Sequence, residues 1–535
     1  MFQRLAKSLA GAAGRTSAPG GAVKGAQAQY LEGLRDRRTG RLLMPHVSLR
    51  TSKDDVGSSW KTSTALAVRA LQNSPWIAGA VDQTVALIVG DELRASVKAD
   101  FSWAGWDDQR SAEWSRAAEK LFAQWARDPQ ECDAAGRHTL GQLQAAAVSM
   151  WFATGEAFAQ VVEIDDRPGA RFATKLRLVP SWTVDLETKA SEQLVQGVYL
   201  DSHAAPIGYR LKWTDLNGSQ RTEDVAARDG FGRPRMVHAF DGLPDQVRGM
   251  TVFAPALKAV RDFDQLANAT MTATTLQTIL AATVKSDYPS ADVLSALQSE
   301  DEIVQGEQSP FDAFMAAKMG WANNTDIDLQ NHGKIAHLMM GERLEFHGAK
   351  TPHNNYEAFA NFLLREIARC IGINTTDLTG DYRQSSYSAI RMANANKWPI
   401  ITRRRRNVPG AISQAVLSAF LEEAIDQDLL QVPGGMDAFI ANRGAICRAD
   451  WIGPPKPQAD DQKAAEAHRI YREMGVISDE TICADLGVDV DDVYRARARE
   501  QGLRDTLGIH GGVTNGGSDV DAMPDSETAT GDDAQ

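Results

Sequence analysis

Residues 354–406 decide the fold: NNYEAFANFLLREIARCIGINTTDLTGDYRQSSYSAIRMANANKWPIITRRRR. The first part of this stretch carries apolar residues at the spacing of an amphipathic helix, which predicts a helix buried along one side. The predicted stripe consists of Phe359, Phe362, Leu363, Ile367, Cys370 and Ile371. Gly372 ends the periodicity, and the polar residues 374–377 are typical of a helix end or cap.

A polar loop is expected after this helix, over residues 379–387. Gly380 can adopt backbone angles that are closed to other residues, which suits a turn. A second, long helical pattern starts at about Ser388 and carries four consecutive arginines at 403–406. The stretch therefore predicts a helix, a polar loop and a long helix.

The pattern NNYEAF…LLREIA…GI…LTGDY…SSYSAIR within this stretch resembles the corresponding region of lambda-like bacteriophage portal proteins. Those proteins form the ring at one vertex of the capsid through which DNA is pumped in and later ejected. In that family the segment is a stem helix, a tunnel loop that projects into the channel, and the long helix behind it. The resemblance implies a mainly helical α+β portal fold, with wing, stem, clip and crown, assembled into a cyclic ring around a central channel.

The resemblance also implies which residues line the channel. These are the residues of the tunnel loop, namely Thr379, Gly380, Asp381, Tyr382, Arg383, Gln384, Ser385, Ser386 and Tyr387. Short polar side chains, with one arginine and two tyrosines, would offer weak and nonspecific contacts to a passing DNA backbone. From the residues alone, the same segment is an exposed turn with a solvated face.

Length and charge limit the class of protein. A chain of 535 residues is too long for one core, so about two to four domains, or one elongated body with subdomains, are expected. The formal charge of −13 argues against a protein that grips nucleic acid over most of its surface, but is compatible with a conduit that DNA passes through. No run of 18 apolar residues is present, so no transmembrane span is predicted.

The four cysteines indicate neither a zinc site nor a disulfide framework. Cys132, Cys370, Cys447 and Cys483 lie far apart and form no CxxC pair, which favours a reducing compartment. Cys370 falls on the apolar stripe and is expected to be a small core residue.

Strong helical patterns are expected in the N-terminal half. Residues 64–90 predict a helix that breaks at Ser74 and restarts at Pro75, with Ser74 as N-cap. Residues 106–160 predict two more helices, the second passing into a strand near Phe158. Tryptophans in these helices could stack on bases, but core positions are the favoured interpretation; they are Trp106, Trp114 and Trp125.

Strands are predicted next, over 171–185, 196–213 and 237–240, with a turn at 206–209. Residues 247–284 then predict a helix after Pro255. Two motifs in these regions resemble portal sequences: Gly155-Glu156, and "VRG…AP-L" before the first stem helix.

The segment between the two stem helices is less regular. It holds four histidines, His332, His337, His347 and His353, whose spacings match no common metal-ligand motif. We expect exposed histidines here and no metal site.

The resemblance, which covers about residues 60 to 510, and the composition of the two tails together divide the chain into nine segments. They are a flexible basic N-terminal arm (1–45), the α+β wing (46–246), stem helix 1 (247–284), the clip (285–350), stem helix 2 (351–372), the tunnel loop (373–389), the long helix and wing return (390–454), a helical crown (455–510) and a disordered acidic tail (511–535). The tail composition, with carboxylates but no Lys or Arg, itself predicts disorder.

The cluster Arg403, Arg404, Arg405 and Arg406 has two interpretations. The arginines could attract DNA phosphates without sequence preference. They could instead form buried pairs or salt bridges between subunits. We favour the second interpretation, because a ring must hold together while DNA slides through it.

No catalytic signature is present. The sequence has no GxxxxGK[ST], HExxH, GxSxG or Rossmann fingerprint, so we expect neither an enzyme nor a cofactor. The leading hypothesis is a portal ring of about twelve subunits in the virion, assembled in the host cytoplasm. The implied partners are double-stranded DNA, the large terminase, the major capsid and scaffold proteins and the head-completion proteins, with no membrane. The alternative is a DNA-processing enzyme or a non-portal head-tail adaptor.

Overall fold

The structure is a computed structural model, and it describes residues 51–215, 217–279, 282–286, 316, 320, 342–346, 356–383, 385–457 and 461–508. The chain divides into two compact units, Met1–Gly453 and Pro454–Gln535. The four histidines and both tails lie outside the described residues.

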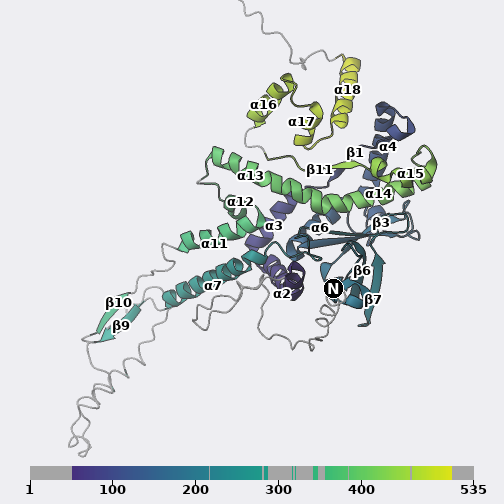
Figure 1. Ribbon diagram of the computed structural model, residues 1–535. Helices are drawn as coiled ribbons and strands as arrows, with labels where there is room; N and C mark the ends of the chain where they lie inside the picture. The colour runs from purple at the N-terminus through teal and green to yellow at the C-terminus, as the bar shows by residue number, and fades with distance from the viewer. Residues whose placement is uncertain are drawn as a thin grey trace, which may run out of the picture. The chain divides into compact units, whose positions relative to one another are not determined.

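Helices dominate the start of the first unit (Figure 1). They are α2 (Ser52–Asn73), α3 (Pro75–Ile88), α4 (Asp108–Arg127), α5 (Pro129–Cys132) and α6 (Leu140–Thr154). Polar caps fix their starts: Thr51, Asp107 and Thr139 each accept a hydrogen bond from a backbone N–H of the first turn. The break at Ser74 is confirmed, although the Ser74 side chain makes no capping hydrogen bond.

Two antiparallel sheets form the β part of this unit. A three-stranded sheet has the order β3-β2-β8, with β2 (Glu156–Glu163), β3 (Thr174–Val179) and β8 (Met236–Phe240). A four-stranded sheet has the order β4-β5-β6-β7, with β4 (Leu194–Val195), β5 (Val198–Leu200), β6 (Pro206–Thr214) and β7 (Gln220–Ala226). The predicted turn at 206–209 is wrong, because these residues already pair within β6.

A long-range strand pair closes the first unit. β1 (Arg94–Val97) pairs antiparallel with β11 (Ala449–Ile452). Short 3-10 turns join the other elements at Ser102–Ala104, Ser181–Thr183, Ala190–Glu192 and Ala254–Ala256.

Two helices and a strand pair follow the sheets. α7 (Leu257–Ile279) and α11 (Tyr356–Ile371) lie side by side, and β9 (Ala282–Ser286) pairs antiparallel with β10 (Glu342–Phe346) at their far end (Figure 1). The helix predicted after Pro255 is confirmed as α7, and the residues before it form an irregular strap. Its predicted end at Val284 is wrong, because Ala282–Ser286 form β9.

A long helical path crosses the first unit after α11. It runs from α12 (Thr375–Thr379) to α13 (Tyr387–Arg405), a π-helical turn η6 (Arg406–Gly410) and α14 (Ala411–Asp426), and ends in α15 (Gly435–Ile446). Pro409 lacks the N–H that an α-helix needs, and the chain accommodates it within the π turn instead of ending the helix. α14 then packs across the sheet β3-β2-β8.

The stripe predicted for α11 is partly wrong. Leu363, Ile367 and Ile371 are buried, but Phe359 and Phe362 are each 52% exposed and stack on each other with ring centroids 6.4 Å apart. The buried face also uses small residues that the apolar pattern passed over, Ala360 and Ala368, together with Leu364. The buried stripe is therefore rotated around the helix away from the two phenylalanines.

Tryptophans of α4 belong to the main core, as predicted. Trp114 and Trp125 are buried there with residues of α3, α6, α11 and α14. A smaller core, around Phe158 and Tyr209, lies between the two sheets. Stacking on bases by these two tryptophans is therefore excluded by burial.

The second unit holds three helices, α16 (Asp461–Glu473), α17 (Asp479–Asp485) and α18 (Val490–Leu507). None of their residues is buried within the described part of the chain. Across the described residues, no helix is both long and apolar enough to cross a membrane.

Candidate functional site

The predicted tunnel loop is shorter than its sequence pattern suggested. Thr379 closes α12, Gly380 takes the left-handed conformation with φ of 66°, and Tyr387 already opens α13. Ser386 caps α13 by accepting a hydrogen bond from the N–H of Ala389. Irregular backbone is thus confined to residues between 380 and 386, with Gln384 outside the described residues.

The exposed part of this loop carries a local ion pair. Arg383 Nη2 lies 2.7 Å from Asp381 Oδ2, and both side chains are open to solvent. The hydrogen bond from the Arg383 side chain lowers the pKa of Asp381 to about 2. The two charges therefore cancel locally at neutral pH, and the loop presents no net charge from this pair.

The near end of the loop is anchored to the long helix. Asp377 accepts a hydrogen bond from Lys397 Nζ at 3.0 Å, and both side chains are only 7% exposed. Tyr382 donates its hydroxyl to the other oxygen of Asp377 at 3.1 Å. The same carboxylate closes the capping box of Asn374 at the start of α12. Asp377 thus holds α12, α13 and one loop side chain together.

A groove of about 1130 Å³ lies beside the anchored end of the loop. Its walls come from α7, α11 and the loop, and include Phe263, Tyr356 and Tyr382. Trp76, at the start of α3, packs edge-on against Phe263 with centroids 6.4 Å apart. The loop therefore lines one groove together with aromatic side chains of α3, α7 and α11.

The four consecutive arginines divide into two roles. Arg404 is buried and donates to the carbonyl of Ile371, the last residue of α11. Arg405 donates to the carbonyls of Leu87 and Ile88, the last residues of α3. Each cation thus meets the negative end of a helix dipole and satisfies carbonyls that the helix leaves unpaired.

Aromatic rings complete the surroundings of these two guanidinium groups. Arg404 lies 5.2 Å from the ring centroids of both Trp151 and Phe152, and Arg405 lies 5.3 Å from that of Trp398. Burial lowers the pKa of each arginine to about 10, so both stay charged at neutral pH. Arg403 and Arg406 are exposed. Of the cluster, these two remain open to DNA or a second subunit.

A buried ion pair lies at the root of α7. Arg248 Nη2 is 2.6 Å from Glu156 Oε1, and both side chains are fully buried. The guanidinium lies between two rings, 4.9 Å from the centroid of Trp60 and 5.4 Å from that of Phe158. This pair joins β2 to the irregular strap before α7. We call the site formed by Glu156, Arg248 and their buried partners the root of α7.

Every N–H of the Arg248 guanidinium has an acceptor. Besides Glu156, the acceptors are the backbone carbonyls of Ser181 at 3.0 Å, Asp185 at 3.2 Å and Gln196 at 3.0 Å. These carbonyls belong to connections leading to the four-stranded sheet. Arg248 therefore ties that sheet to β2 and to the root of α7.

Glu156 is satisfied from two further directions. It accepts a hydrogen bond from the N–H of Gly249 at 2.8 Å and one from His238 Nε2 at 3.0 Å. Burial alone would raise the pKa of Glu156, but the Arg248 charge and the His238 hydrogen bond reverse the effect and hold that pKa below its usual value. Burial lowers the pKa of His238, so the imidazole is neutral and donates its Nε2–H.

Two glycines let the backbones meet at this point. Gly155 has φ of 85°, and a Cβ there would lie 2.0 Å from the carbonyl carbon of Met250. A Cβ on Gly249 would lie 2.2 Å from the carbonyl oxygen of Gly155. Gly155-Glu156 and "VRG" each resemble portal sequences, but the sequence did not predict that they contact each other. Glu156 and Arg248 are 92 residues apart in the chain and form a direct ion pair in the structure.

The described residues hold no group of three or more His, Cys, Asp or Glu side chains that could bind a metal ion.

Comparison with known proteins gives a consistent result. The model of a family described as "Phage portal protein, lambda family" matches residues 39–405. The chain is 25% identical over 454 residues to Portal protein B of Escherichia phage lambda, covering 82% of this chain and 83% of that protein. It is 24% identical over 460 residues to the Portal protein of Escherichia phage N15, covering 84% and 86%.

Solved structures give a weaker likeness. A chain of "Virion of native gene transfer agent (GTA) particle" is 14% identical, with a TM-score of 0.43, covering 82% of this chain and 99% of that one. A chain of "The Crystal Structure of a HK97 Family Phage Portal Protein from Corynebacterium diphtheriae to 2.9A" is 11% identical with a TM-score of 0.30, covering 63% and 88%.

Proposed function

The chain belongs to the lambda family of phage portal proteins, and from that premise we propose that it forms a closed ring of about twelve subunits through which double-stranded DNA passes. The observation that carries the proposal is the extent of the family match. It spans residues 39–405 and so includes α7, α11, the loop and all of α13. The family is a structural one, and the match favours a portal over a DNA-processing enzyme or a non-portal adaptor.

We propose that the loop between Gly380 and Ser386 faces the channel. Its ion pair is closed on itself and its other side chains are polar, so its attraction for phosphates is weak. Weak contacts suit a conduit, because each strong contact would have to be broken as DNA moves. The proposed channel residues are Thr379, Gly380, Asp381, Tyr382, Arg383, Gln384, Ser385, Ser386 and Tyr387.

The exposed arginines of the cluster belong to the same proposal. Arg403 and Arg406 are available for contacts to a neighbouring subunit, whereas Arg404 and Arg405 already hold the ends of α11 and α3. The neighbouring-subunit role is therefore proposed for Arg403 and Arg406.

We propose that the segments of the portal family correspond to the following parts of this chain. The wing corresponds to 46–246, the stem to 247–284 and 351–372, the clip to 285–350, the tunnel loop to 373–389, the long helix and wing return to 390–454, and the crown to 455–510. In this arrangement the clip meets the large terminase and later the head-completion proteins. The ring assembles in the host cytoplasm with scaffold and major capsid proteins and stays in the virion.

Native mass tests the proposal. Mass photometry and negative-stain images of the full chain should give particles of about twelve times 58.2 kDa with a central hole. A compact dimer with ATP- or metal-dependent activity on DNA would contradict it.

A further inference from the structure

We propose that a pocket between the β8 region and the helices α14 and α15 is a docking site for an acidic peptide segment of a partner protein. The pocket has a volume of about 660 Å³. It lies within the first unit and shares no residue with the loop or the arginine cluster. The inference goes beyond the proposed DNA conduit and does not depend on it.

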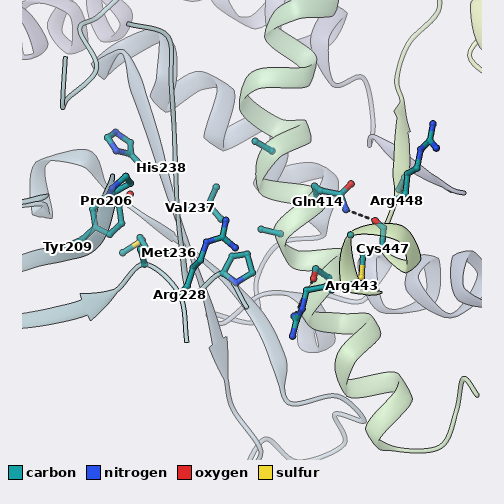
Figure 2. Close-up of a pocket in the computed structure, with 17 residues that line it drawn as sticks. Pro206, Tyr209, Arg228, Met236, Val237, His238, Gln414, Arg443, Cys447 and Arg448 are labelled. Carbon is teal, nitrogen blue, oxygen red and sulfur yellow. Dashed lines mark hydrogen bonds between the residues drawn. The ribbon is translucent and has the colours of Figure 1, made fainter. Parts of the chain in front are cut away.

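Two groups of elements form the walls, as Figure 2 shows. Tyr209, Met236 and Val237 come from the strands, and Gln414 and Cys447 face them from the helical side. The sheet and the helices are brought together by α14, which packs across the three-stranded sheet. The pocket opens beside that contact.

The floor of the pocket is apolar. Met236, Ala415 and Cys447 are buried there. The Gln414 amide is already used, because its nitrogen donates to the Cys447 carbonyl at 2.6 Å and its oxygen accepts from Trp451. The floor therefore suits an aliphatic or aromatic side chain, which gains by leaving water.

The rim of the pocket is basic. Three arginines line it, Arg228, Arg443 and Arg448, and no carboxylate does. Arg443 Nη1 is 2.7 Å from Glu422 Oε2, but its Nη2 is buried and has no acceptor among the described residues.

Charge complementarity selects an acidic peptide. The chain carries a formal charge of −13, whereas the pocket lining holds three arginines and no carboxylate; Arg443 is paired with Glu422 beyond the lining, and Arg228 and Arg448 add positive charge to it. Guanidinium groups pair well with carboxylates, and an extended peptide can place an apolar side chain between two such contacts. DNA fits less well, because its phosphates could reach the rim but nothing in its backbone would fill the apolar floor.

Gly444 offers a way to close the pocket without disturbing the core. It lines the pocket near the end of α15, and a Cβ built there meets no atom within 4 Å. Gly444→Phe places a ring in the pocket space. Gly444→Ala is the matched control, since it changes the same backbone position but leaves the space open.

The test uses the full chain and a fluorescein-labelled peptide of sequence Asp-Glu-Leu-Leu-Asp-Glu, with binding followed by fluorescence anisotropy. Wild type and Gly444→Ala should bind alike, and Gly444→Phe should bind about tenfold more weakly or not at all. Arg228→Glu should weaken binding similarly, while Arg221→Glu, an exposed arginine of β7 outside the pocket, should not. Thermal unfolding of each variant checks that it is folded.

Two comparisons separate the peptide from other occupants. Replacing both leucines of the peptide by serine should reduce affinity, because the apolar floor is then left unfilled. The proposal is overturned if wild type fails to bind the peptide, if folded Gly444→Phe binds it as well as Gly444→Ala, or if a DNA duplex binds with the same dependence on Gly444 and Arg228.

Discussion

Two carboxylate–guanidinium pairs in this chain have nearly equal contact distances and opposite surroundings. Glu156 and Arg248, at the root of α7, approach to 2.6 Å with neither side chain exposed. Asp381 and Arg383, in the loop, approach to 2.7 Å with exposed fractions of 44% and 85%. The comparison shows that contact distance alone says little about what an ion pair does.

Burial changes the cost of breaking each pair. At the root, removing one partner leaves a charge in a place that water does not reach, and the acceptors around Arg248 come from several segments. In the loop, water replaces either partner at small cost. The root is therefore a rigid joint between the sheets and α7. The described contacts of the loop are its anchor at Asp377 and short-range hydrogen bonds to residues next to it in the chain.

The largest expected effect is at the root. Arg248→Leu leaves Glu156 buried without its cation, and we expect a loss of about 3–5 kcal/mol in the free energy of unfolding. Urea unfolding of the full chain measures it. Adding Glu156→Leu should recover part of the loss, because the uncompensated charge is then gone. If Arg248→Leu cost no more than a surface substitution, the root would not be a joint.

The close backbone contact at Gly155 gives the next effect. Gly155→Ala combines a positive φ with a Cβ only 2.0 Å from the Met250 backbone, so we expect at least about 2 kcal/mol of destabilisation. Gly218→Ala is a matched control, since Gly218 has φ of 80° but open space around a Cβ. If the two variants lowered the unfolding midpoint equally, the Met250 backbone would have to move away from the new Cβ at no measurable cost in stability.

Acidification should distinguish the two regions further. The pKa of His238 is lower in the folded protein than in the unfolded chain, whose His238 has the ordinary value of 6.5. As the pH falls below 6.5, the unfolded chain therefore takes up a proton at His238 before the folded protein does, and the free energy of unfolding decreases. The lowered pKa of Glu156 acts in the same direction below pH 4.5. Thermal unfolding between pH 7.5 and 5.5 should show a falling midpoint, and His238→Gln should flatten that slope. If His238→Gln left the pH dependence of the unfolding midpoint unchanged, His238 would not be the group that causes it.

The smallest effect on stability is expected in the loop. Arg383→Ala removes an exposed ion pair that water and salt already screen, so the free energy of unfolding should change no more than for an ordinary surface substitution. Its consequence should appear in DNA passage instead, measured as the yield of filled particles in a packaging assay. A large loss of stability in Arg383→Ala would show that the loop is a structural joint like the root.

The sequence alone predicted the helices whose apolar residues recur along one face. Ile77, Val81, Val85 and Ile88 recur in the sequence at the spacing of one helix face, and all four are buried. The break at Ser74 and the end of α11 at Gly372, where φ is 86°, also follow from local rules.

Tertiary contacts decided the features that local patterns missed. On α11, Ala360 and Ala368 are buried together with larger aliphatic residues, whereas Phe359 and Phe362 stay exposed, and the apolar pattern alone did not separate the two groups. Arg404 and Arg405 have adjacent sequence positions but cap two different helices. The partnership of Glu156 with Arg248, and the pocket beside Gly444, join segments remote in the chain. No spacing within one segment encodes them.

The most direct test of the central claim is a cryo-electron microscopy reconstruction of the full chain in its assembled form. Our account predicts a closed ring in which the loop between Gly380 and Ser386 of every subunit projects into one central channel, while the Glu156–Arg248 joint stays buried within each subunit. A ring with this loop on its outer surface, or an assembly without a channel, would contradict it.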